Sequence, residues 1–304
     1  MKIKTVISAL VGLVVFAGSF GLHSQSALES VEPLFEYPKV PDQLTKVNMR
    51  SNYMVLHLWD ECPLDKEAIT NVASFRETFS DFLSFFVLAD YKEVEKGVKK
   101  FVDKVAKNKT NLDTVLGFVD AELFTPQSRH WSDDVYSIFA KALLDNRKVE
   151  KNTKEMLETN LKILANSKLD TQLGNLTFVK PHDGKATLYD LTSEYVFVFF
   201  NSDGSVDDSI YKLRLNTDVS TNALIKNGNI SIVSVYSGTT PDAEMDGEPE
   251  NWYVAKLDDM QQTYDMRVKP TLYILSKDKK IIAKSPSVSQ VLGMTAQMKA
   301  ALNL

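Results

Sequence analysis

The 304-residue sequence contains a single cysteine, Cys62, and little glycine or proline. One cysteine excludes an intramolecular disulfide framework, a Cys-x-x-Cys redox pair and a four-cysteine zinc site. With 12 glycines and 10 prolines, the chain is neither of low complexity nor collagen-like. It also lacks a basic excess, because 35 lysines and arginines stand against 40 aspartates and glutamates. This balance argues against a protein that binds nucleic acid.

The remaining composition is that of an ordinary globular protein. Hydrophobic residues make up 44% of the chain and charged residues 25%. The length favours about two domains of roughly 150 residues each. No motif for a cofactor or a metal ion stands out, so we expect neither.

The N-terminus has the pattern of an export signal. Lys2 and Lys4 precede an apolar run over 6–17, which has signal-peptide length and is shorter than the ~20 residues that span a bilayer. Small residues permit cleavage after Ser26. We therefore expect residues 1–26 to be removed, the protein to reach the periplasm and no membrane span to remain. An uncleaved membrane anchor is the alternative.

From about residue 45 to 166, within the part 27–168 of the chain, the sequence has helical periodicity. Apolar residues recur every three or four positions, with lysines between them, as in Val94, Val98, Phe101, Val102 and Val105. The segment Thr70–Ala89 contains five phenylalanines and predicts the most buried helix. The pattern indicates a bundle of five or six helices over roughly 120 residues.

Residues 169–304 have the pattern of strands alternating with helices. A hairpin is predicted over 176–191, with its turn at 182–185, and 195–200 is apolar on both faces, as in a central covered strand. A polar loop leads to a short helix predicted around 256–264. The predicted order is β-hairpin, β, α, β, α, β, β, α, an α/β fold with helices on both faces of the sheet.

Four stretches of this part follow one another in a recognisable order: Leu173–Leu191, Val196–Asp207, Ile230–Tyr236 and Tyr264–Ile282. They resemble the opening hairpin, the strand before the active-site turn, the second central strand and the cis-proline loop of the TlpA-type envelope thiol–disulfide oxidoreductases. The N-terminal half resembles an uncharacterised helical domain that precedes TlpA-like domains in Gram-negative envelope proteins. The expected fold is therefore α/β, with a thioredoxin-like domain over 169–304 preceded by an all-α helical bundle over 27–168.

The resemblance ends at the active-site turn. The family places Cys-x-x-Cys at the start of the first helix, where the helix dipole lowers the pKa of the exposed thiol. Gly204, Ser205, Val206 and Asp207 stand at these positions, and Ser205 with Asp208 predicts a capping box. A serine hydroxyl cannot cycle through a disulfide, so we expect a redox-inactive domain without catalytic residues.

The cis-proline loop is retained in Lys269-Pro270. The resemblance implies that the backbone before this proline pairs with an extended peptide, in a groove formed by Ser202, Trp252, Lys269, Pro270 and Thr271. The alternative is that the proline is kept only because the fold needs the turn. The predicted function is a binding module for an extended peptide or an envelope partner, with no affinity for nucleic acid.

Four other hypotheses remain open. Cys62 could act as a one-thiol relay by forming a mixed disulfide with another protein. Ser205 could be a hydrolase nucleophile with His182 as its base, although no Gly-x-Ser-x-Gly motif is present. The acidic loop 242–250 could bind calcium weakly, although an EF-hand would need glutamate where Tyr253 stands. The function could also belong to the helical domain, with the C-terminal half as a scaffold.

Overall fold

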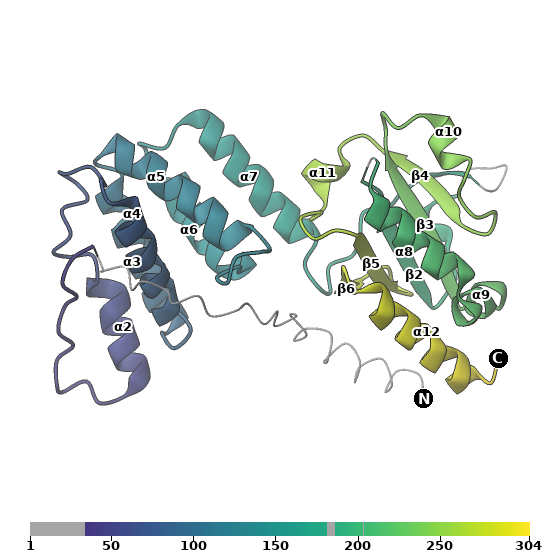
Figure 1. Cartoon of the computed structure of the whole chain (residues 1–304), viewed down its shortest axis with the longest axis horizontal. Coiled ribbons are helices and arrows are strands. Elements are labelled where there is room, and N and C mark those ends of the chain that lie inside the picture. The colour runs from purple at the N-terminus through teal and green to yellow at the C-terminus, as the bar shows by residue number, and fades with distance from the viewer. Residues whose placement is uncertain (1–33, 181–185, 203) are drawn as a thin grey trace. The chain divides into compact units, whose positions relative to one another are not determined.

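The computed structural model describes residues 34–180, 186–202 and 204–304 (Figure 1). These residues form two compact units that divide between Leu161 and Lys162. The predicted signal peptide and the predicted hairpin turn, which includes His182, lie outside the described residues. Within the described part of the chain, no helix has both the length and the apolar character needed to cross a membrane.

The N-terminal unit is helical, as the sequence predicts. Its described elements are α2 (Val47–His57), α3 (Val72–Phe85), α4 (Tyr91–Val105), α5 (Lys109–Val119), the π-helical turn η1 (Asp120–Phe124), α6 (Asp133–Asp145) and α7 (Lys151–Asn166). Polar side chains begin several of these helices: Asn71, Asn108 and Ser132 each accept a hydrogen bond from a backbone N–H in the first turn.

Aromatic rings fill the core of this unit. The ring of Trp59 lies 5.6 Å from that of Phe75 and 4.8 Å from that of Phe101, measured between centroids. Phe75, Phe79 and Phe82 of α3 are all fully buried, in line with the prediction for this helix. Helices α2 and α4 cross closely at Gly97, where a Cβ atom would lie 2.5 Å from the carbonyl oxygen of Val55. Only glycine fits this crossing without a shift of the backbone.

The C-terminal unit is built on a six-stranded sheet in its described residues. In spatial order the strands are β1 (Phe178–Lys180), β4 (Tyr253–Leu257), β3 (Ile230–Ser237), β2 (Tyr195–Phe200), β5 (Thr271–Ser276) and β6 (Ile281–Lys284). Strands β2, β3 and β4 are parallel, and β1, β5 and β6 pair antiparallel to their neighbours. The helices are η2 (Leu188–Asp190), α8 (Val206–Thr217), α9 (Val219–Lys226), α10 (Asp242–Met245), α11 (Met260–Thr263) and α12 (Val288–Leu302).

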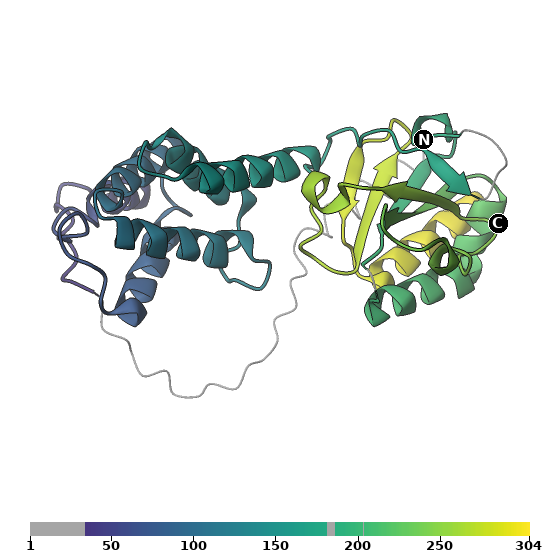
Figure 2. The same cartoon turned by 90° about the horizontal axis from the view of Figure 1, so that it is seen from above.

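The central strand β2 is buried along its whole length, as its sequence predicts. Alternate residues enter two different cores, since side chains of a strand point to opposite faces. Tyr195, Phe197 and Phe199 pack with α8, α9 and α12, whereas Val198 and Phe200 pack with the segments around β1, η2 and α11. The three long helices therefore cover one face of the sheet (Figures 1 and 2), and the short helices α11 and η2 pack on the other face, so helices lie on both faces as predicted.

Two predicted elements are corrected. The helix predicted around Lys256–Tyr264 is shorter than expected and consists of α11 alone. The residues before it, Tyr253–Leu257, form strand β4, which was not predicted and which pairs between β3 and β1. The strand predicted over Ala186–Leu191 is reduced to a bridge between Thr177 and Thr187. Thr187 then forms a capping box with Asp190 and begins η2, which ends the strand.

The last turn of α7 belongs to the C-terminal unit. The side-chain amide of Asn166 donates to the carbonyl oxygen of Thr263 at 3.2 Å, and the hydroxyl oxygen of Ser167 accepts from the backbone N–H of Asp265 at 2.8 Å. The division between the units therefore lies inside α7, before the boundary at residue 168 that the sequence pattern predicts.

Candidate functional site

One edge of the sheet gathers most of the positions that the sequence singles out. Phe200, the last residue of β2, pairs with Val235 on β3 and with Thr271 at the start of β5. The turn after β2 and the Lys269–Pro270 loop before β5 therefore leave the sheet at the same edge. In open α/β sheets, the carboxyl ends of parallel strands are the usual place for ligands.

The turn at the start of α8 has a conformation that suits glycine. Gly204 has a φ of +67°, and a Cβ atom there would meet no other atom within 4 Å. Ser205 is the N-cap of α8, and its hydroxyl accepts from the N–H of Asp208 at 3.2 Å, so half of the predicted capping box is present. Val206 and Asp207 are exposed in the first turn.

The second hydrogen bond of the predicted capping box, from the N–H of Ser205 to the side chain of Asp208, does not form in the described residues. The N–H of Ser205 donates to the carbonyl oxygen of Ser202 at 3.0 Å, so it is not available to the carboxylate of Asp208. That carboxylate instead accepts from the N–H of Ser202 at 2.7 Å. Asp208 is 2% exposed, and its other oxygen and the hydroxyl of Ser202 are both buried without a hydrogen-bond partner in the described residues.

These carboxylates change what the helix start can do. In the oxidoreductases that the sequence resembles, the positive end of the helix stabilises a thiolate. Here Asp207 and Asp208 place two acidic groups in the first turn. A negative charge at this position would be repelled by them, so the turn does not suit an anionic nucleophile or an anionic ligand.

The second loop at this edge contains the cis peptide bond that the resemblance implies, between Lys269 and Pro270. The carbonyl oxygen of Val268 accepts from the hydroxyl of Thr271 at 2.8 Å, which holds the loop against β5. Lys269 is exposed, and neither its backbone N–H nor its carbonyl forms a hydrogen bond within the described residues. The loop therefore presents a fixed main-chain donor and acceptor.

A buried ion cluster anchors this loop from below. Arg267 donates to both carboxylate oxygens of Asp265, at 2.8 and 2.9 Å, and Lys284 of β6 donates to one of them at 2.8 Å. Although burial alone would raise the pKa of the Asp265 carboxyl, the hydrogen bond from Arg267 and the charge of Lys284 hold that pKa well below its usual range. Tyr273 donates to the carbonyl oxygen of Asp265 at 2.8 Å.

Two residues of the predicted groove lie inside the protein instead. Trp252 and Thr271 are both 0% exposed. Trp252 packs in the core beneath α8, and Thr271 pairs with β2 and donates its hydroxyl within the loop. A peptide on the surface would therefore meet Ser202, Lys269 and Pro270, with the other two supporting them from the interior.

A polar pocket at the same edge was not predicted from the sequence. It has a volume of about 340 Å³ and is lined by Asn201 after β2, Ser237 at the end of β3 with Thr239 after it, and Asp258–Gln262 after β4. Gly238 lies beside it, and a Cβ atom there would clash with the carboxylate of Asp258, so a larger residue would displace that side chain. Strand β4 was not predicted from the sequence, so the residues that follow it, Asp258–Gln262, were not expected at this edge.

The acidic loop between β3 and β4 is not uniformly solvated. The side chain of Glu248 is buried, and one of its oxygens accepts from Ser234 at 2.9 Å, from Lys212 of α8 at 2.5 Å and from the hydroxyl of Tyr236. Asn201 donates to the hydroxyl of Ser234 at 2.8 Å and links this cluster to the turn after β2. The loop is thus tied to the sheet edge by Glu248. No group of three or more His, Cys, Asp or Glu side chains that could hold a metal ion occurs among the described residues.

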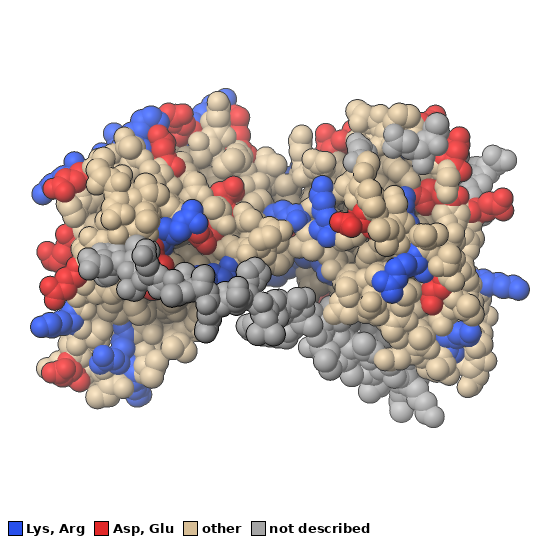
Figure 3. All heavy atoms as spheres, in the orientation of Figure 1, with Lys and Arg blue, Asp and Glu red and all other residues tan. Residues whose placement is uncertain are grey.

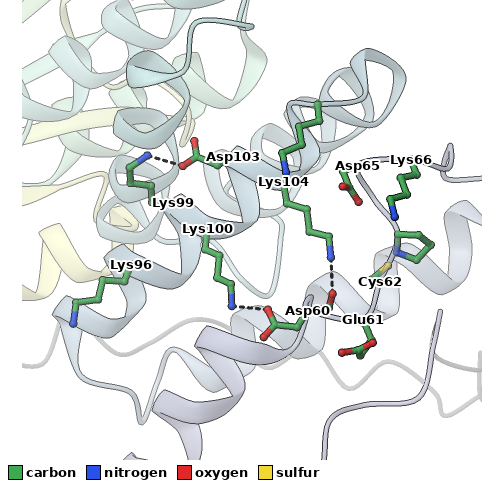
Figure 4. Close-up of a pocket in the computed structure, with 12 residues that line it drawn as sticks. Asp60, Glu61, Cys62, Asp65, Lys66, Lys96, Lys99, Lys100, Asp103 and Lys104 are labelled. Carbon is green, nitrogen blue, oxygen red and sulfur yellow. Dashed lines mark hydrogen bonds and ion pairs between the residues drawn. The ribbon is translucent and has the colours of Figure 1, made fainter.

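The lone thiol lies in the N-terminal unit, at a pocket of about 880 Å³ between α4 and the segment after α2. Lys104 donates to the carbonyl oxygens of Trp59 and Asp60, both at 2.7 Å, and Lys100 pairs with the carboxylate of Asp60 at 2.5 Å (Figure 4). These lysines thus hold the end of α2. Cys62 is 2% exposed, and burial raises the pKa of its thiol to about 11. Such a thiol is protonated at neutral pH and shielded from other proteins.

The fold has known relatives. The described chain is similar to the crystal structure of a thioredoxin-like protein from Bacteroides caccae, with a TM-score of 0.65 and 19% identity over 88% of this chain and 99% of that one. It is also similar to the thioredoxin domain of a thiol-disulfide oxidoreductase from Bacteroides vulgatus, with a TM-score of 0.37 and 17% identity over 43% of this chain and 97% of that one. The C-terminal unit is thus a thioredoxin-like fold, and the N-terminal part is helical.

The N-terminal part also matches a family of domains. Residues 18–167 match the family described as "Domain of unknown function (DUF5106)", just under half of the chain. No curated protein matches the sequence.

Proposed function

We propose that this protein is a redox-inactive, thioredoxin-like binding module of the cell envelope that holds an extended peptide segment at the Lys269–Pro270 edge. The observation that carries the proposal is the exposed Lys269, whose backbone N–H and carbonyl lack partners within the described residues and whose loop is held in place from below. An extended peptide can pair with such groups as an added strand does, with affinity from the main chain.

The anchoring of the loop supports a binding role. Asp265, Arg267 and Lys284 fix the segment that leads to the cis bond, and the hydroxyl of Thr271 fixes the carbonyl of Val268. A main-chain donor and acceptor that are already positioned lose little conformational entropy when a peptide binds. The polar pocket beside Asn201 could then receive one side chain of that peptide and contribute specificity.

The chemistry of the chain argues against thiol–disulfide exchange. The sequence has one cysteine, so no internal disulfide can form, and that thiol is buried with a raised pKa. The helix start carries two carboxylates where a thiolate would need a positive environment. The one-thiol relay through Cys62 and the serine hydrolase hypothesis gain no support from this geometry. The location in the envelope rests on the N-terminal signal pattern.

Selection of linear peptides from a random display library tests the proposal. The purified chain serves as bait, and the dissociation constants of the selected peptides are measured by fluorescence anisotropy. Because one net hydrogen bond contributes about 0.5–1.5 kcal/mol, N-methylation of one peptide amide should weaken binding by about 2- to 13-fold at the position that pairs with Lys269.

Two variants of the chain localise the binding. Lys269→Glu should weaken a selected peptide, whereas Lys226→Glu, which makes the same charge change on an exposed position of α9, should not. Peptides that bind both variants equally and that tolerate N-methylation throughout would place the binding elsewhere and contradict the proposal.

A further inference from the structure

Helix α8 carries an exposed apolar stripe that the peptide-binding edge does not use. Val206, Ile210 and Leu213 are 71%, 52% and 61% exposed. They stand at positions i, i+4 and i+7, so they form one continuous row along the helix. Large apolar side chains that are exposed singly need no explanation, but a contiguous row on one helix face is typical of an interaction surface.

The row lies on the side of α8 that faces away from the sheet. The opposite side of the helix packs into the core through Asp208, Tyr211 and Leu215. In Figure 1, α8 lies at the front of the C-terminal unit, and in the same view Figure 3 shows mostly uncharged surface over it, with a few acidic and basic side chains. Among the described residues of the C-terminal unit, no other element buries this row.

Two oppositely charged residues flank the row on one side. With about 3.6 residues per turn, Asp207 and Arg214 fall on the same flank of α8, two turns apart. Both are exposed, and neither side chain forms a hydrogen bond or an ion pair within the described residues. The acidic group is in the first turn of the helix and the basic group in the last.

This pattern is complementary to itself when two copies of the helix run antiparallel. We propose that α8 is a homodimer interface, in which a two-fold axis passes near Ile210 and Val206 of one copy packs on Leu213 of the other. In antiparallel pairing, the same flanks of both helices meet, so Asp207 faces Arg214 of the second copy and the converse pair forms as well. Parallel pairing about a two-fold axis would bring opposite flanks of the two helices together, so Asp207 and Arg214 of one copy would face the flank of Ser209 and Asn216 and form no ion pair.

The closed symmetry of this arrangement limits it to a dimer, because the same patch is used by both copies. Three apolar side chains and two ion pairs make a small contact compared with the ~800 Å² per partner of a typical stable interface. The dimer should therefore be weak and should depend on protein concentration. It does not depend on the proposed peptide binding, since it uses the outer face of α8 rather than the Lys269 loop.

Sedimentation velocity of the purified chain over a range of concentrations tests the dimer. We expect a monomer–dimer equilibrium whose dissociation constant rises by at least about 10-fold in Ile210→Glu, because two carboxylates would then meet at the axis. Leu88→Glu is the matched control, because Leu88 is similarly exposed, at 55%, but lies in the N-terminal unit. A chain that stays monomeric at all concentrations overturns the proposal, as does a dimer that Ile210→Glu leaves unchanged.

Charge reversal tests the antiparallel register. Asp207→Lys and Arg214→Glu should each weaken the dimer, and the double variant should restore it, because the pairs are exchanged across the interface. Thermal melts at a concentration where the chain is monomeric separate this effect from helix stability. Failure of the double variant to recover, with its fold intact, contradicts this register.

Cross-linking gives an independent answer in the Cys62→Ser background. Ile210→Cys should form an intermolecular disulfide under mild oxidation, since the two copies of this residue lie at the axis. Val206→Cys alone should not, because its two copies would be separated by ~12 Å along the helices, beyond disulfide reach. A mixture of Val206→Cys and Leu213→Cys chains should cross-link again. Equal cross-linking of all single variants would overturn the proposed geometry.

Discussion

The backbone N–H of Ser202 donates a 2.7 Å hydrogen bond to the carboxylate of Asp208, across the turn that begins α8. This bond places a buried acidic group in the turn that the sequence resemblance aligns with an oxidoreductase active-site turn. The turn is thus stabilised by a side chain that is unfavourable for thiolate chemistry. The hydrogen bond between Ser202 and Asp208 therefore helps to hold the turn in shape.

Replacement of Asp208 should destabilise the protein. Asp208→Ala removes the acceptor of the Ser202 N–H, and an unsatisfied buried donor costs about 1–3 kcal/mol. Urea unfolding of the variant should show a loss of this size. Asp207→Ala, at the exposed neighbouring position, is the control and should cost less, since a carboxylate near a helix N-terminus contributes only about 0.3–1 kcal/mol. Equal effects of the two variants would contradict the structural role of Asp208.

A pair of glycine variants tests the backbone of the same turn. Gly204 and Gly117 both have open space where a Cβ atom would stand, but only Gly204 has a positive φ. Gly204→Ala should therefore lower the free energy of unfolding by about 1–2 kcal/mol, because an L-residue is strained there. Gly117→Ala, inside α5, should raise it by up to about 1 kcal/mol. A stabilising Gly204→Ala would show that the turn adopts another conformation.

The sequence predicts some parts of this molecule well and others poorly, for physical reasons. Strand β2 is apolar on both faces and is long enough to be identified from its residues alone. Strand β4 is short and partly exposed, and its burial depends on strands far away in the sequence, so its pattern resembles that of a loop. The pocket lined by Asp258–Gln262 is missed for the same reason.

The features of the candidate site also differ in how well the sequence predicts them. The cap at Ser205 follows from local sequence and the cis bond before Pro270 from the family resemblance, and both are present. The ion pair of Glu248 with Lys212 depends on packing between distant elements, and it could not be predicted from spacing along the chain.

The reactivity of Cys62 should be low in the folded protein. Its thiol is buried and has a pKa of about 11, so at pH 8 the thiolate fraction is ~100-fold lower than for a free cysteine. Alkylation by iodoacetamide, followed by mass spectrometry, should therefore be at least about 100-fold slower in the native chain than in urea. Rapid alkylation of the native chain would support the hypothesis that Cys62 acts as a one-thiol relay, whereas slow alkylation would support a structural thiol.

The cluster below the cis-proline loop should make stability depend on acidity. The pKa of the Asp265 carboxyl is lowered in the folded protein, so the folded state holds this group ionised where the unfolded chain begins to bind protons. Its contribution to stability is fully present above the unfolded pKa of about 4 and is lost progressively as the pH falls below it. Arg267 and Lys284 are the partners that lose their counter-charge.

Asp265→Asn isolates this contribution. At pH 7 the variant should unfold more easily by about 3 kcal/mol, because it leaves Arg267 and Lys284 as largely buried charges without their acid. The difference in unfolding free energy between variant and wild type is measured by urea unfolding at pH 7, 4 and 3. It should shrink as the pH falls, because at low pH Asp265 of the wild type takes up a proton when the chain unfolds, which lowers the stability of the wild type. A difference that stays constant over this range would mean that Asp265 is not the group whose ionisation stabilises the loop. Asp278→Asn, an exposed position between β5 and β6, should show no such pH dependence.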